Sequence, residues 1–158
     1  MTPRIREAVG SDVDRILPLM EAYWAFEQVP RFESGRIRRQ LEHFLCTPKF
    51  GQAWIAEEGE RVIAYAVAAY VYSFEYGGSM AELDELFVEE GSRGRGLGRA
   101  LITTAGEALE RHGCVAVQLQ VADWNEAGQR FYDREGFAPK RGYRLWVAPL
   151  GTPRSRGA

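Results

Sequence analysis

A glycine-rich stretch at residues 93–98 constrains the fold of this chain more than any other feature. It reads Arg-Gly-Arg-Gly-Leu-Gly, follows the apolar run Leu-Phe-Val at 86–88 and precedes a long amphipathic run. This order predicts a strand, a tight turn and a helix. Glycine has no Cβ to keep a ligand from the backbone, and a helix start offers unpaired N–H groups and a positive dipole end. The stretch therefore predicts an anion cradle that suits a diphosphate.

The stretch differs from the common nucleotide-binding motifs. A dinucleotide fingerprint places its three glycines early in a βαβ unit, with an acidic residue about twenty positions later. A P-loop requires a lysine followed by serine or threonine, and here Arg99 and Ala100 follow Gly98. The residues thus indicate a diphosphate site of another kind, with a purely structural turn as the alternative. Arg93, Arg95 and Arg99 would add positive charge to it.

Length and composition predict one globular domain at residues 1–150, with a polar and disordered tail at 151–158. The chain has 158 residues, of which 46% are hydrophobic. A net charge of −2 argues against nucleic-acid binding, which favours a strongly basic surface. The sequence has neither an apolar signal region at its start nor an apolar run long enough to span a membrane. We therefore expect a cytoplasmic protein that has no nucleic-acid or membrane partner.

The two cysteines, Cys46 and Cys114, are too few and too far apart for a disulfide framework or a zinc site. We expect both to be buried thiols. His43 lies three residues before Cys46, but nothing in its surroundings indicates a catalytic pair. The sequence therefore predicts no metal.

Hydrophobic periodicity and turn residues predict an α/β fold with a mixed, largely antiparallel sheet and the order β-α-α-β-β-β-α-β-α-β-β. The helix after the glycine stretch joins the fourth and fifth strands, so these two should be parallel. Strands are expected at residues 5–8, 52–57, 61–73, 80–88 and 115–121, helices beginning near 11, 34, 98 and 127, and a terminal hairpin at 137–150.

Three segments together resemble the GCN5-related N-acetyltransferases, the GNAT family. They are Glu-Leu-Asp-Glu-Leu-Phe-Val at 82–88, Arg-x-x-Gly-x-Gly at 93–98, and Asn125 followed by Phe-Tyr at 131–132 and Gly-Phe at 136–137. The resemblance covers nearly the whole chain. It implies the GNAT fold, in which strands four and five splay apart to hold acetyl-CoA. Residues 83–88 and 121–126 look most like the diamine, polyamine and thialysine acetyltransferases.

The resemblance also implies a set of residues that bind acetyl-CoA. The glycine loop would bind the pyrophosphate, and a main-chain N–H near Phe87 would polarise the thioester carbonyl. Asn125 would bind the cofactor arm or cap a helix, and these two roles are compatible. Tyr132 would protonate the leaving thiolate as general acid, or simply pack beside Phe131. The implied cofactor-binding residues are Phe87, Val88, Arg93, Gly94, Arg95, Gly96, Leu97, Gly98, Arg99, Asn125 and Tyr132.

A primary amine has a pKa near 10, so a base must remove its proton, directly or through water. Alternation along residues 80–88 places Glu82 and Asp84 on one face and Glu85 on the other, and a bulge could reverse this. The resemblance implies a base on this strand, and the polyamine-like branch favours the position of Asp84. Asp84 and Glu82 both remain candidates.

The amine pocket is expected between the first two helices and the turn after the third strand. Acids and aromatic rings there suit a cationic substrate, although each residue could instead be core or surface. The candidates are Tyr23, Trp24, Glu27, Phe74, Glu75, Tyr76 and Glu85.

The sequence thus predicts an N-acetyltransferase that moves an acetyl group from acetyl-CoA to a primary amine of a small molecule, directly in a ternary complex. The amine could belong to a polyamine, a thialysine-like amino acid or an aminoglycoside. One alternative is a protein acetyltransferase acting on an N-terminal amine or a lysine, and another is a non-catalytic acyl-CoA-binding module. Trp146 and Val147 on the expected last hairpin indicate a homodimer by analogy with family members of this size.

Overall fold

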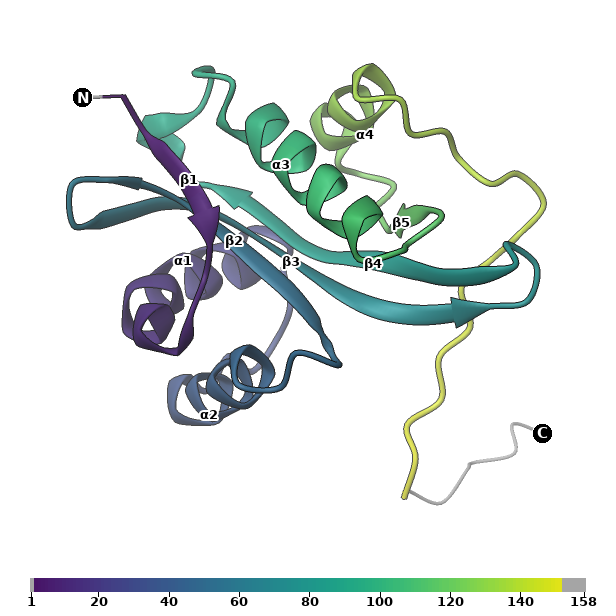
Figure 1. Cartoon of the computed structure of the whole chain (residues 1–158), viewed down its shortest axis with the longest axis horizontal. Helices are drawn as coiled ribbons and strands as arrows, with labels where there is room; N and C mark the ends of the chain where they lie inside the picture. Colours follow the sequence, from purple (N-terminus) through teal and green to yellow (C-terminus); the bar gives the residue numbers. More distant parts are fainter. Residues whose placement is uncertain (1, 152–158) are drawn as a thin grey trace.

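A five-stranded sheet with the order β1-β2-β3-β4-β5 runs through the molecule in the computed structural model, which describes residues 2–151 (Figure 1). All neighbouring strands are antiparallel except β4 and β5, which are parallel as expected. The strands are β1 (Arg4–Glu7), β2 (Gly51–Glu58), β3 (Arg61–Ser73), β4 (Gly78–Val88) and β5 (Val117–Leu119), and the helices are α1 (Val13–Phe26), α2 (Ser34–Leu45), α3 (Leu97–Arg111) and α4 (Glu126–Arg134).

Helices cover both faces of this sheet, with α1 and α2 on one face and α3 and α4 on the other (Figure 1). The first core contains Ile16, Ile37 and Tyr65, and the second contains Trp54, Leu101 and Leu109. Because β2 and β3 lie between these two cores, both strands are apolar on both faces. No helix among residues 2–151 is long and apolar enough to cross a membrane.

The parallel pairing of β4 with β5 is very short. It joins Ala81 to Val117, Glu82 to Gln118 and Leu83 to Leu119, and then stops. The second half of β4 therefore has a strand partner only on its β3 side. The two strands separate at this point, as the family resemblance implies.

A bulge lies in β4 at the residue where this pairing ends. Val67 of β3 pairs with Glu85, but the next residue, Ala68, pairs with Leu83, so Asp84 is an extra residue. As a result, Leu83 packs in the core under α3, whereas Phe87 packs in the core under α1 and α2. Simple alternation would put these two residues on the same face. The bulge that the sequence pattern allowed, but did not require, is therefore present.

The expected terminal hairpin at 137–150 does not form. Among residues 135–151 the described structure contains no strand, and the chain runs past the β3–β4 turn and away from the sheet (Figure 1). Tyr143, Leu145 and Val147 do alternate, but all three are exposed because no element of this chain covers them. The predicted tail lies outside the described residues from position 152 onward.

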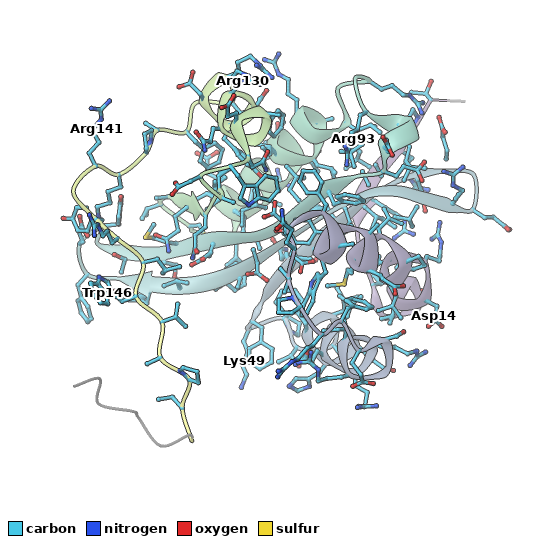
Figure 2. The ribbon with its side chains drawn as sticks, turned by 180° about the vertical axis from the view of Figure 1, so that it is seen from behind. Asp14, Lys49, Arg93, Arg130, Arg141 and Trp146 are labelled. Carbon is cyan, nitrogen blue, oxygen red and sulfur yellow. The ribbon has the colours of Figure 1, made fainter. Side chains whose placement is uncertain are left out.

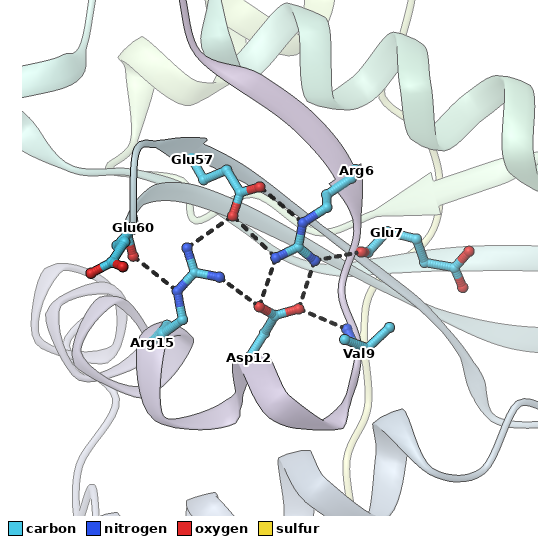
Figure 3. A network of polar contacts seen from close by, with 7 residues as sticks. All are labelled: Arg6, Glu7, Val9, Asp12, Arg15, Glu57 and Glu60. Carbon is cyan, nitrogen blue, oxygen red and sulfur yellow. Dashed lines mark hydrogen bonds and ion pairs between the residues drawn. The ribbon is translucent and has the colours of Figure 1, made fainter. Parts of the chain in front are cut away.

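A network of charged side chains fixes the start of α1 to the sheet (Figure 3). The carboxylate of Asp12, in the short 3-10 turn Gly10–Asp12, accepts two hydrogen bonds from Arg6, one from Arg15 and one from the Val9 amide, at 2.7–2.9 Å. Both arginines also donate to Glu57 of β2. The hydrogen bonds from Arg6, then those from Val9 and Arg15, lower the pKa of Asp12 from 3.8 to about 2 against the opposing effect of burial.

Replacing Asp12 by asparagine should lower the free energy of unfolding by about 2 kcal/mol at neutral pH. A depressed pKa in the folded state stabilises the protein above the ordinary aspartate range, so this difference from wild type should shrink as the pH falls from about 4 toward 2. Chemical denaturation at several pH values measures it. Asp14→Asn is the control, because the Asp14–Arg38 ion pair is exposed and should contribute little to stability. Equal losses in both variants would contradict the prediction.

Candidate active site

A cavity of about 530 Å³ opens where β4 and β5 separate. Its walls come from the end of α1, the second half of β4, the glycine loop, the start of α3, the chain after β5, and α4. The residues that line it are Tyr23, Phe26, Glu27, Leu83, Asp84, Leu86, Phe87, Val88, Ser92, Arg93, Gly94, Gly96, Leu97, Gly98, Arg99, Gln120, Val121, Asn125, Ala127, Gly128, Phe131, Tyr132, Arg134 and Glu135.

The glycine loop forms one end of this cavity. Gly94 and Gly96 have φ values of 75° and 76°, in the left-handed region that favours glycine. Gly96 is the N-cap of α3, so the amides of the first helical turn point toward the loop without partners inside the helix. A Cβ at Gly94 or Gly96 would meet no protein atom within 4 Å. Both glycines therefore border open space rather than packed side chains.

Gly98 has a different role. A Cβ at this position would lie 3.1 Å from the Phe131 ring of α4, so the absence of a side chain lets α4 pack closely against the start of α3. Phe131 in turn contacts Tyr132 edge-on at 5.1 Å between ring centres. The third glycine thus lets the helix that carries Tyr132 pack closely against α3.

The three arginines of the loop region have separate positions. The Nε of Arg93 donates to the Val88 carbonyl at 3.0 Å, and its guanidinium lies over the rings of Phe26 and Phe87 beside the cavity. Arg99 also lines the cavity and forms an ion pair with Glu135 at 3.6 Å. Arg95 does not line it, because its side chain pairs with Glu58 of β2 at 2.5 Å.

Tyr132 lies on the cavity wall in a largely buried position. Burial, and then the charge of Glu27, raise the pKa of Tyr132 to about 12. Its hydroxyl therefore stays protonated at neutral pH. Asn125 caps α4 by accepting a hydrogen bond from the Gly128 amide at 2.9 Å, and it also lines the cavity, so its two expected roles are spatially compatible.

The bulge separates the three acids of β4. Asp84 lines the cavity, and burial together with the charge of Glu82 raises its pKa. Glu82 lies outside the lining and accepts hydrogen bonds from Gln118 and Gln120 at 3.0 Å. Glu85 is only 8% exposed and is also absent from the lining. Of the two candidate bases, Asp84 alone borders the cavity.

Among the candidate substrate-binding residues, only Tyr23 and Glu27 line the cavity. Burial is the main reason that the pKa of each is raised. Glu75 and Tyr76 instead lie at the β3–β4 turn, where Lys140 pairs with the Glu75 carboxylate and lies over the Tyr76 ring. Phe74 is exposed, and Trp24 packs against the core under α1.

Several lining residues were not among the sequence candidates, notably Phe26, Gln120, Phe131, Arg134 and Glu135. Gln120 could have been anticipated, because it lies in the strand predicted before Asn125. Arg134 and Glu135 follow Tyr132 within one helical turn, so the same helix brings them to the site. Phe26 could not have been predicted as a site residue, because nothing in the neighbouring sequence distinguishes it from other apolar residues of α1.

The model of the acetyltransferase (GNAT) family matches residues 16–137. The chain belongs to this family. It is therefore an acyl-transferring enzyme, and the family uses acetyl-CoA as co-substrate.

Curated relatives agree with this assignment. The chain is 28% identical to a mouse (Mus musculus) thialysine N-epsilon-acetyltransferase over 82% of its own length and 80% of that protein. It is 40% identical to an uncharacterized N-acetyltransferase of Methanocaldococcus jannaschii, but this match covers 43% of the chain and only 30% of the archaeal protein. The solved structure of an integron cassette protein from the mobile metagenome of Cole Harbour salt marsh has a TM-score of 0.80 at 29% identity. It covers 94% of this chain and 91% of that one.

The cavity fits the diphosphate of coenzyme A. Two glycines leave open space beside a helix start, and Arg93 and Arg99 supply positive charge. Among residues 2–151 no group of three or more histidine, cysteine or acidic side chains could hold a metal ion.

Replacing Gly96 by alanine should weaken coenzyme A binding about tenfold or more, because the new Cβ would enter the open space beside the loop. Isothermal titration calorimetry with coenzyme A measures the dissociation constant. Gly113→Ala is a matched control: Gly113 also has a positive φ and no neighbour for a Cβ, but lies after the other end of α3. Both variants should lose about 1 kcal/mol of stability, and only Gly96→Ala should lose affinity. Unchanged affinity in Gly96→Ala would contradict the assignment of the loop.

Proposed function

We propose that this enzyme moves the acetyl group of acetyl-CoA to the primary amine of a small molecule by direct transfer in a ternary complex. The observation that carries the proposal is that Asp84 and Tyr132 border the same cavity as the glycine loop. A carboxylate with a raised pKa and a protonated phenol are the two groups that an amine acetylation needs.

In the proposed reaction the amine nitrogen attacks the thioester carbonyl, and the carbon–sulfur bond breaks as the amide forms. Asp84 takes the proton that the amine loses, through a water molecule. Tyr132 gives its proton to the departing thiolate of coenzyme A. A main-chain N–H near Phe87 polarises the carbonyl, and the loop that includes Gly94 and Gly96 binds the pyrophosphate.

A small cationic substrate is supported by the charges that α1 and β4 bring to the cavity wall. Glu27 and Asp84 are acidic, and Tyr23 adds an aromatic face. The mouse relative is named a thialysine N-epsilon-acetyltransferase, which is consistent with an amine on a flexible side chain. We propose a polyamine or a thialysine-like amino acid as the substrate class.

Release of coenzyme A from acetyl-CoA in the presence of a panel of polyamines, thialysine, aminoglycosides and lysine peptides tests the proposal. A small amine should stimulate release, and Tyr132→Phe should reduce kcat about 10²-fold while the affinity for coenzyme A stays within about twofold. Stimulation by peptides alone would favour a protein substrate. Tight binding without stimulation by any amine would favour a non-catalytic module.

The same assay distinguishes the two candidate bases. Because Asp84 must lose its proton to act, kcat/KM should rise with pH through its raised pKa, and Asp84→Asn should abolish this rise. Glu82→Gln tests the alternative. If Glu82→Gln rather than Asp84→Asn abolished the rise, the assignment of the base would be reversed.

We also propose that the enzyme is a homodimer that uses its C-terminal segment. Residues 143–150 contain several large apolar side chains that are largely exposed, and Trp146 is 88% exposed. Lys140 holds this segment against the β3–β4 turn, where Tyr72 and Phe74 are exposed as well. Figure 2 shows Trp146 on this segment, away from the helices. A second copy is the favoured occupant, because an alternating segment and the open outer edge of β5 can pair between copies.

Light scattering should therefore give twice the chain mass of 17.8 kDa. Trp146→Ser should shift the protein toward the monomer, because it removes the largest exposed apolar side chain of the segment. Val9→Ser is the control, since Val9 is an exposed apolar residue elsewhere, just before the 3-10 turn Gly10–Asp12. A monomeric wild-type protein, or a dimer that Trp146→Ser leaves intact, would contradict the proposal.

A further inference from the structure

Glu85 is a buried acid that the proposed reaction does not use. Its carboxylate accepts a hydrogen bond from the Trp24 indole at 2.9 Å and one from the Tyr65 hydroxyl at 2.7 Å. These partners come from α1 and β3, so the carboxylate ties together three elements. It does this at the residue directly after the bulge in β4.

The bulge decides which face Glu85 occupies. In a regular strand Glu85 would share a face with Leu83, which packs in the core under α3 among aliphatic residues such as Leu97 and Leu101. A carboxylate there would be buried among apolar side chains, which is strongly unfavourable. On the opposite face, Glu85 reaches two hydrogen-bond donors. The carboxylate is therefore satisfied in the bulged register and unsatisfied in the regular one.

We infer that Glu85 is a positioning residue that locks the bulged register of β4 and thereby places Asp84 on the cavity wall. The effect of Glu85 on activity rests on the proposed function. The structural part of the inference concerns only which residues face each other across β3 and β4.

The same hydrogen bonds also set the distance between two walls of the cavity. Trp24 lies in the last turn of α1, next to Tyr23 and three residues before Glu27, the C-cap of the helix. Tyr23 packs edge-on against Phe87, with ring centres 6.1 Å apart. Glu85 thus fastens the wall formed by α1 to the wall formed by β4. Loss of this link should affect the amine side of the cavity more than the glycine loop.

Two substitutions at Glu85 separate hydrogen bonding from simple burial. Glu85→Gln keeps both interactions, because the amide oxygen can accept from Trp24 while the amide nitrogen donates to the Tyr65 oxygen. Glu85→Leu has a similar size but loses both hydrogen bonds. A leucine at this position can also be buried in the apolar core under α3. Glu85→Gln should keep kcat within about threefold, whereas Glu85→Leu should reduce kcat about 10²-fold with the KM for acetyl-CoA within about threefold.

Nuclear magnetic resonance measures the pairing of β3 with β4 directly and does not depend on enzymatic activity. In the wild type and in Glu85→Gln, cross-strand contacts should join Val67 to residue 85. In Glu85→Leu, Val67 should instead contact Asp84 in part or all of the population. If no amine is acetylated by the wild type, the proposed function fails while this measurement still tests the register.

Three results would overturn the inference. Glu85→Leu could keep both the pairing of Val67 with residue 85 and the wild-type kcat. It could lose acetyl-CoA affinity in proportion to kcat, which would indicate a general structural role. If Glu85→Leu fails to fold, Tyr65→Phe provides the test, because it removes one of the two donors. It should lower kcat about tenfold with an unchanged KM for acetyl-CoA, and an unchanged kcat would overturn the inference.

Discussion

The short parallel pairing between β4 and β5 is the feature on which the site depends. β4 has eleven residues, but only Ala81, Glu82 and Leu83 pair with β5. Beyond Leu83, the backbone groups on that side of β4 have no neighbouring strand, and buried backbone groups require partners. A ligand in the cavity can supply them. The bulge at Asp84 begins at this same point, so one local departure from a regular sheet creates both the cavity and the position of its acid.

The glycine loop contributes to architecture as well as to binding. Gly94 and Gly96 border open space, whereas a Cβ at Gly98 would lie 3.1 Å from the Phe131 ring of α4. The absence of this Cβ lets α4 pack closely against α3, and α4 carries Tyr132 to the cavity. A motif that looks uniform in the sequence therefore contains two functions. The first two glycines leave room for an anion, and the third allows close packing of the helix that carries the phenol.

Local pattern predicted the order of the first nine elements and the parallel pairing, because periodicity and a crossover helix leave few other arrangements. It could not show contacts between distant residues. Arg95 was expected at the anion site but pairs with Glu58, and Glu75 was expected at the amine pocket but pairs with Lys140. The prediction of a terminal hairpin was also wrong. Alternation in residues 143–147 shows that a strand could form, but not that this chain provides a second strand to pair with it.

The cavity combines opposite charges, with Arg93 and Arg99 near the loop and Asp84 and Glu27 on other walls. On the proposed function this creates a conflict, because a carboxylate that attracts a cationic amine also stabilises its ammonium form, which cannot attack a thioester. The raised pKa of Asp84 reduces the conflict. Desolvation at the cavity wall makes its carboxylate a stronger base, so it takes the proton more readily once the amine is bound. The position of Asp84 at the bulge therefore affects its basicity as well as its access to the bound amine.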